Sequence, residues 1–196
     1  SQCDFLSDKL LAHLRESHTK NPLSLGTPKR SLQSGVLMEL GPSAFDALIA
    51  RLHDEKELVS ADGLVRENDW KPQLTNAEEN AARHLVALLE HSKWTPPKPE
   101  DIDINCKKPD ALVAYLIAEN KIIRIGGMLY SRKNIGLLVE EVRAVLEKEG
   151  SMSPSRFKEI TSLSRKTAIP LLEYLDAEKI TKRQGDTRVS ATSYSQ

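Results

Sequence analysis

Apolar residues recur along the chain in three similar blocks, which cover residues 47–67, 111–131 and 170–190. Each block opens with apolar residues at positions i, i+1 and i+4, the spacing of one face of an α-helix. The equivalent leucines, Leu48, Leu112 and Leu171, are 64 and 59 residues apart. A repeat of about 60 residues therefore fills the chain three times.

A two-stranded hairpin is predicted to close each block. Two short apolar or β-type runs flank the turn pairs Asp62-Gly63, Gly126-Gly127 and Gly185-Asp186. Tight hairpin turns need positive φ angles, and glycine and aspartate adopt them readily. The third block reads as one residue shorter before its first strand.

A long amphipathic helix is predicted ahead of each block. In the second repeat it begins at a capping box formed by Thr75 and Glu78, and in the third it ends at Gly150. A shorter helix follows in the first and third repeats. A capping hydroxyl with a following proline marks its start, at Thr27-Pro28 and at Ser153-Pro154.

The order of helix, short helix, helix and hairpin is that of a helix-turn-helix followed by a wing. The predicted fold class is therefore mainly α with small β-hairpins, arranged as tandem winged-helix domains over residues 1–72, 73–132 and 133–196. Prolines crowd residues 94–99, so the second domain should have a loop or a degenerate second helix there.

Composition narrows the class of protein. Lys+Arg and Asp+Glu number 28 each, so the formal net charge is zero and a wholly basic nucleic-acid protein is disfavoured. No apolar run approaches a membrane span of about 20 residues. Cys3 and Cys106 form no CxxC pair, which indicates free thiols and no zinc finger. The start at Ser1 suggests a fragment of something longer.

No pattern typical of catalysis is present. The chain lacks GxxxxGK[ST], GxSxG and HExxH. Its five histidines form no pair at i+3 or i+4 with another histidine or a thiol, so they are expected at surfaces or helix flanks: His13, His18, His53, His84 and His91. We therefore expect no active site, no metal and no cofactor.

Positive charge gathers in the third repeat. Residues 150–196 hold eight Lys or Arg and five Asp or Glu, a net +3 that leaves −3 for the rest. Arg165 and Lys166 lie at the start of the predicted recognition helix, where a phosphate would be favoured. The cap is Ser164 or Thr167, depending on whether Pro170 falls inside the helix or in its first turn. On charge alone, a solvated face explains the cluster equally well.

The runs 163–176 (LSRKTAIPLLEYLD) and 181–189 (TKRQGDTRV) resemble one family. They are similar to the C-terminal winged helix of the bacterial selenocysteine-specific elongation factor, SelB. The match is strong over the last 30 to 40 residues and otherwise one of architecture. That family ends in four tandem winged helices, of which this chain would hold the last three.

The resemblance implies a role in translation elongation and selenocysteine incorporation. The family is GTP-binding and cytoplasmic, and its terminal winged helix holds an mRNA hairpin, the selenocysteine insertion element (SECIS), that recodes UGA. It implies no GTPase in this chain and a ribosome contact. The sequence itself has no apolar span and no sign of an oligomer, so we expect no membrane and a monomer. The residues implied to grip the RNA are Ser164, Arg165, Lys166, Lys182, Arg183, Gly185, Asp186 and Arg188. Tyr174 is either a base-stacking residue or a core residue.

Two other functions fit a winged helix. A DNA-binding transcription regulator usually carries one such domain per chain with a dimerisation or effector domain, so three in tandem with zero net charge fit poorly. A protein-interaction scaffold would not need clustered Arg and Lys at a helix start and wing. The sequence therefore favours RNA binding.

Overall fold

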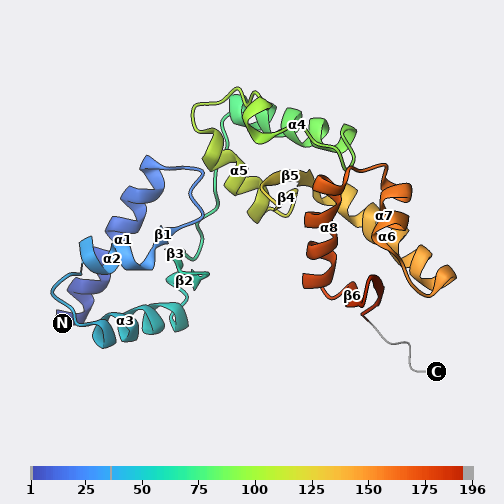
Figure 1. Ribbon diagram of the computed structural model, residues 1–196. Coiled ribbons are helices and arrows are strands. Elements are labelled where there is room, and N and C mark those ends of the chain that lie inside the picture. The colour runs from blue at the N-terminus through green and yellow to red at the C-terminus, as the bar shows by residue number, and fades with distance from the viewer. Residues whose placement is uncertain (1, 36, 192–196) are drawn as a thin grey trace. The chain divides into compact units, whose positions relative to one another are not determined.

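The computed structural model describes residues 2–35 and 37–191, and the side chains from residue 4 onwards in those ranges. Contacts divide the chain into two compact units (Figure 1). The first comprises residues 1–78 with 110–115, and the second comprises residues 79–109 with 116–196. Cys3 lies outside the described side chains, whereas Cys106 is a free thiol.

The first unit begins with α1 (Gln2–Lys20), α2 (Lys29–Gly35) and α3 (Pro42–Asp54). The strands β1 (Thr27–Pro28), β2 (Leu58–Ala61) and β3 (Leu64–Glu67) form an antiparallel sheet in the order β1-β3-β2. Leucines of α1 and α2 pack with the apolar face of α3 and with the sheet. Because each element buries one apolar face in this cluster, one core holds the unit together: Leu10, Leu14, Leu32, Leu37, Phe45, Leu48, Ile49, Leu52, Leu58 and Val65.

The predicted cap at Thr27-Pro28 is wrong. These residues form β1, in which Thr27 pairs with Val65 and Pro28 with Leu64, and the short helix begins at Lys29. Proline has no N–H to donate to a sheet, but it is tolerated on an edge strand. β1 is the edge of this sheet, so the same two residues serve as a strand.

The second unit contains the rest of α4 (Asn76–His91) and α5 (Pro109–Ala118), the two helices that cross the division. Residues 95–98 form a loop that leads into the 3-10 turn Pro99–Asp101, so the expected loop or degenerate second helix of the second repeat is confirmed. A two-stranded sheet follows α5, and another lies at the end of the described chain. The remaining elements are β4 (Ile122–Ile125), β5 (Met128–Ser131), α6 (Arg132–Glu149), α7 (Pro154–Thr161), α8 (Arg165–Ala177), β6 (Thr181–Gln184) and β7 (Thr187–Ser190).

The other helix-end signals are confirmed. Thr75 N–H donates to Glu78 at 2.9 Å, and Glu78 N–H donates to the Thr75 hydroxyl at 3.3 Å, a capping box. Ser153 caps α7 by accepting the Arg156 N–H at 3.1 Å, with proline at the first helical position. Gly150 ends α6 with φ of 76°.

The three repeats join helix and hairpin in the same way. Lys56, Asn120 and Lys179 adopt φ near 60° just past α3, α5 and α8. The next N–H in each repeat bonds back to the last buried leucine of the helix at 2.9 Å, as in a Schellman motif: Glu57 to Leu52, Lys121 to Leu116, and Ile180 to Leu175. Three residues separate helix and strand every time. The expectation of a shorter third copy was therefore wrong.

Within the second unit, the β4–β5 hairpin packs against α8. Ile125 and Tyr130 share a buried cluster with Leu171 and Leu175 of that helix. A Cβ added at Gly126 would lie only 2.5 Å from Pro170 Cβ, so glycine is what allows this approach. The last helix of the third repeat is thus supported by the β4–β5 hairpin of the second repeat.

Asn134 fastens α6 to the end of α4. Its Nδ2 donates to the carbonyls of Leu89 and Glu90, both at 2.9 Å, and of Lys93 at 3.2 Å. Trp94 Nε1 donates in return to the Asn134 carbonyl at 3.1 Å. Leu89 lies in the last turn of α4, where carbonyls lack helical N–H partners, so Asn134 caps that end and holds α6 against it.

The architecture confirms the predicted fold class, mainly α with small antiparallel hairpins in winged-helix domains. In the part of the chain that the structure describes, no helix is both long and apolar enough to cross a membrane. The proposed domain limits at 72 and 132 stay predictions. The second coincides with the passage from β5, which ends at Ser131, to α6, which begins at Arg132.

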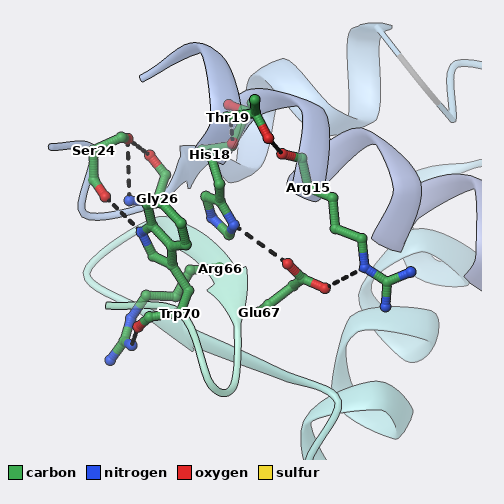
Figure 2. Close-up of polar contacts among 10 residues, drawn as sticks. Arg15, His18, Thr19, Ser24, Gly26, Arg66, Glu67 and Trp70 are labelled. Carbon is green, nitrogen blue, oxygen red and sulfur yellow. Dashed lines mark hydrogen bonds and ion pairs between the residues drawn. The ribbon is translucent and has the colours of Figure 1, made fainter. Parts of the chain in front are cut away.

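One histidine departs from the expected surface position. His18 is 2% exposed and stacks on the Trp70 ring, with centroids 4.1 Å apart and planes 7° from parallel. Figure 2 shows its Nδ1 facing Glu67, at 3.5 Å, while Arg15 holds the other carboxylate oxygen at 2.7 Å. Trp70 Nε1 donates to the Ser24 carbonyl at 2.9 Å. The cluster ties α1 to the segment after β3.

This cluster should make the first unit sensitive to acid. Burial lowers the pKa of His18 below its ordinary 6.5, although Glu67 opposes the shift. The unfolded chain therefore binds the proton first, so this contribution to stability is present above pH 6.5 and is lost as pH falls below it. Between pH 7.5 and 5.5, the wild type should lose more unfolding free energy than His18→Phe, in urea titrations. Equal losses of unfolding free energy in the wild type and in His18→Phe would contradict this assignment. His84→Gln, which replaces an exposed histidine, is the control and should behave as the wild type does.

Candidate nucleic-acid interface

The start of α8 is an exposed, positively charged helix terminus. Ser164 is the N-cap and accepts the Thr167 N–H, with its hydroxyl 2.7 Å from the Thr167 hydroxyl. Arg165 and Lys166 are the first two helical residues, and both are exposed. Their N–H groups precede the first intrahelical hydrogen bond, so they and the helix dipole favour an anion here.

The cap settles the position of Pro170. With Ser164 as the cap, Pro170 lies inside α8. It has no N–H to offer, so the Lys166 carbonyl loses its helical partner. The ring packs against the β4–β5 turn at Gly126 instead. The interior proline is therefore part of the contact that supports the helix.

The wing of the third repeat carries the second group of predicted residues. Strands β6 and β7 are paired from Thr181↔Ser190 to Gln184↔Thr187, which leaves Gly185 and Asp186 as the turn. Gly185 has φ of 60°, as the first position of a type II′ turn requires. Lys182 and Arg183 are exposed, and Arg183 Nε donates to the Gly185 carbonyl at 3.1 Å.

Arg188 is engaged inside the domain. Its guanidinium forms a bidentate pair with Asp176 of α8, with Nε at 3.0 Å and Nη2 at 2.9 Å from Oδ2. The two side chains are only 11% and 27% exposed, and the Thr181 hydroxyl also donates to Asp176. A role of Arg188 in RNA binding stays a prediction, but its present contacts fasten the wing to the helix.

Alignment of the repeats shows what this polar group replaces. The position of Arg188 is occupied by Val65 in the first repeat and by Leu129 in the second, both buried. That comparison was available in the sequence and would have indicated an inward-facing Arg188. A buried cation at an apolar position needs a partner, and Asp176 supplies it.

Arg156 of α7 is also neutralised. It binds Glu149 with Nη2 at 2.7 Å from Oε1, and Nη1 lies 3.2 Å from Glu159. The Arg156 hydrogen bond lowers the pKa of the Glu149 carboxyl. By contrast, no ion pair involves Arg165, Lys166, Lys182 or Arg183 among residues 2–35 and 37–191. These four cations keep their charge available.

The eight predicted residues do not form one cluster. Ser164, Arg165 and Lys166 lie at the N-terminal end of α8, whereas Asp176, which pairs with Arg188 of the wing, lies near its C-terminal end. Figure 1 shows the wing strand β6 beyond that C-terminal end of α8. A helix of 13 residues is about 20 Å long at 1.5 Å per residue. A ligand that touches both groups must therefore extend over several nucleotides.

Tyr174 is half-buried at the side of the core. It packs against the hydrophobic cluster of the third repeat, and Arg132 Nη1 lies 3.4 Å from its hydroxyl. Burial raises the pKa of this tyrosine. Within the described ranges, no three His, Cys, Asp or Glu side chains gather as a metal site would require.

Comparison with known proteins agrees with this architecture. A winged-helix model described as "Elongation factor SelB, winged helix" matches residues 144–190, and a second model with the same description matches residues 11–66. Together the two matches cover more than half of the chain. They coincide with the third and first repeats.

Relatives extend the likeness over most of the chain. A selenocysteine-specific elongation factor from Desulfomicrobium baculatum is 27% identical over 190 residues, which are 94% of this chain and 30% of that protein. The crystal structure of the bacterial selenocysteine-specific elongation factor EF-Sec matches with a TM-score of 0.56 and 22% identity, over 95% of this chain and 30% of that one.

A third similarity is to the mRNA-binding domain of elongation factor SelB from E. coli, solved with SECIS RNA. Its TM-score is 0.43 at 18% identity, over 60% of this chain and 98% of that one. The chain spans about 30% of the length of the relatives that it matches almost completely. From the two family models and the repeated winged helices, the chain belongs to the winged-helix region of the elongation factor SelB family.

Proposed function

We propose that this chain is the mRNA-hairpin-binding region of a selenocysteine-specific translation elongation factor. It would recognise the selenocysteine insertion element that directs recoding of UGA. The observation that carries this proposal is the start of α8, where Arg165 and Lys166 are exposed and unpaired beside a capped helix terminus. Family membership supplies the class of ligand.

The chemistry of the helix start suits a phosphate. Two cationic side chains, two free N–H groups and the positive end of the helix dipole converge there. The wing adds Lys182 and Arg183 toward the other end of α8. Such contacts fix the position of a nucleic-acid backbone, while recognition of sequence requires contacts with bases.

The separation of the two groups favours a folded RNA over a mononucleotide. A ligand spanning about 20 Å can place phosphates at both groups and expose an unpaired base between them. RNA is usually recognised through backbone shape and a few such bases. A hairpin with an unpaired loop or bulge has both features.

The remaining parts of the proposal concern the longer protein. GTP binding and hydrolysis would belong to parts outside this chain, which would itself be no enzyme and hold no cofactor. The first two repeats would act as arms between those parts and the mRNA. A ribosome contact, a monomeric state and a cytoplasmic location follow from the same role in translation.

A binding titration tests the proposal. The chain is titrated against the selenocysteine insertion hairpin of its own organism, a scrambled hairpin and duplex DNA, at two salt concentrations. Arg165→Ala/Lys166→Ala should weaken hairpin binding roughly tenfold or more and reduce the slope of log K against log salt by about 1 to 2.

The matched control is Arg143→Ala/Lys148→Ala, which removes two exposed cations from α6 of the same repeat. It should leave hairpin affinity within about twofold, because its only effect is a long-range one that salt screens. Equal, weak binding to all three nucleic acids would overturn the proposal in favour of a protein-interaction scaffold. Tighter binding to duplex DNA would favour a transcription regulator.

A further inference from the structure

An aliphatic side chain stands in the middle of the candidate interface. Ile169 of α8 is 42% exposed. It lies four residues after Arg165 and three after Lys166, so all three share one face of the helix. Single exposed aliphatic residues are ordinary on protein surfaces, so exposure alone would carry no inference.

Comparison with the first repeat supplies the second observation. α3 and α8 have 13 residues each and align without a gap, which places Asp46 at the position of Ile169. Asp46 is 63% exposed and pairs with Lys29 at 2.8 Å. The second repeat has Asp110 at this position. The third repeat alone replaces an acid with an apolar group, between cations that have no ion-pair partner in the described chain.

The replacement changes what this face can bind. An aspartate would repel phosphate and neutralise one of the adjacent cations. An isoleucine removes that repulsion and presents an apolar surface, and unpaired bases pack against apolar side chains. Its neighbours can hold the flanking phosphates at the same time.

We propose that Ile169 contacts one unpaired nucleobase of the bound RNA, an inference that rests on the proposed function. Arg165 and Lys166 bind the adjoining phosphates, and the contact distinguishes a hairpin with that base from one without it. The partner is a single-stranded nucleotide in a loop or bulge, since a paired base has both faces covered by its neighbours in the stack.

The test combines protein variants with altered RNA. Each unpaired position of the hairpin is replaced in turn by 2-aminopurine, whose emission responds to stacking, and by an abasic nucleotide. At one position the wild type should change the emission, and loss of the base should weaken binding roughly fivefold. Ile169→Ala should weaken binding of the intact hairpin by about the same factor and bind the abasic hairpin no more weakly than the wild type does.

Two further variants separate apolar contact from charge. Ile169→Lys adds a cation, so it should keep or increase affinity at low salt while abolishing the preference for the intact hairpin. Leu137→Ala, at a 47% exposed leucine of α6, is the control and should behave as the wild type does. Thermal melts establish that each variant is folded.

The outcomes keep the two proposals apart. If the wild type fails to prefer the hairpin over scrambled RNA, the proposed function itself fails. If the wild type shows that preference but Ile169→Ala retains full affinity and full sensitivity to every abasic position, the base contact is overturned. Equal loss for Ile169→Ala and Leu137→Ala would also overturn it, because the effect would not belong to this face of α8.

Discussion

Asp176→Ala should destabilise the third repeat by about 2–3 kcal/mol. The substitution leaves the Arg188 side chain, which is 11% exposed, without its bidentate partner, and it removes the acceptor of the Thr181 hydroxyl. An unpaired cation at that depth must be rehydrated or pay for its burial, and either change loosens the wing from α8. Urea unfolding gives the magnitude, and hydrogen exchange of the β6 and β7 peptides locates it.

A matched variant tests whether the Asp176–Arg188 ion pair gives more stability than apolar residues would at the same positions. The second repeat has Ile117, Ile122 and Leu129 at the positions of Asp176, Thr181 and Arg188. The triple variant Asp176→Ile/Thr181→Ile/Arg188→Leu should therefore fold with a stability within about 1 kcal/mol of the wild type, because apolar residues of similar volume often replace a buried ion pair without loss.

The exposed Asp186 of the wing turn provides the control. Asp186→Ala removes the same charge without burying anything, and its effect should stay within about 0.5 kcal/mol. If Asp176→Ala lost no more stability than Asp186→Ala, solvent would be screening the Asp176–Arg188 pair as it does a surface ion pair. The inference that this pair anchors the wing to α8 would then be wrong.

The same ion pair shows where sequence reasoning stops. The run 181–189 is locally basic, and the family resemblance implies that its Arg188 grips RNA. The partner of Arg188 lies 12 residues earlier, on a helix, and only the packing of the wing on α8 brings them together. Charge patterning describes how many cations a segment has, but their availability depends on contacts that are distant in sequence.

Features set by local geometry were predicted well. The hairpins follow from the turn pairs that adopt positive φ, and the capping box at Thr75 and the Ser153 cap follow from side chains that reach their own backbone. The predicted helix cap at Thr27-Pro28 was wrong because the same dipeptide suits an edge strand. The neighbouring strand β3 pairs with it and makes it a strand. The predicted surface position of His18 was wrong because its stacking partner, Trp70, lies 52 residues away in the sequence.

Gly126→Ala should destabilise the protein about as much as Asp176→Ala does, because it displaces the β4–β5 hairpin that packs against α8. The φ of 56° at this residue is unfavourable for alanine by about 1–2 kcal/mol. The new Cβ would also lie 2.5 Å from Pro170 Cβ and 2.9 Å from Cγ. The proline ring is rigid, so the hairpin or the helix must shift, and overpacking of this kind adds about 1–3 kcal/mol.

Gly127→Ala is the matched control for the backbone strain. Gly127 has φ of 83°, but a Cβ there would meet nothing within 4 Å. Gly127→Ala should therefore lose only the stability that the strained backbone costs, about 1–2 kcal/mol. It should leave binding of the RNA hairpin unchanged. Gly126→Ala should instead weaken the proposed RNA binding as well as stability, because the helix that it displaces carries Arg165 and Lys166.

A double-mutant cycle with Pro170→Gly decides whether the contact itself is responsible. Removing the ring from Pro170 leaves room for the new methyl group, so the combined loss in Gly126→Ala/Pro170→Gly should be smaller than the sum of the two single losses. Strict additivity would mean that the hairpin does not press on α8 in solution. A favourable coupling accompanied by recovered RNA affinity would establish that the wing of the second repeat positions the recognition helix of the third.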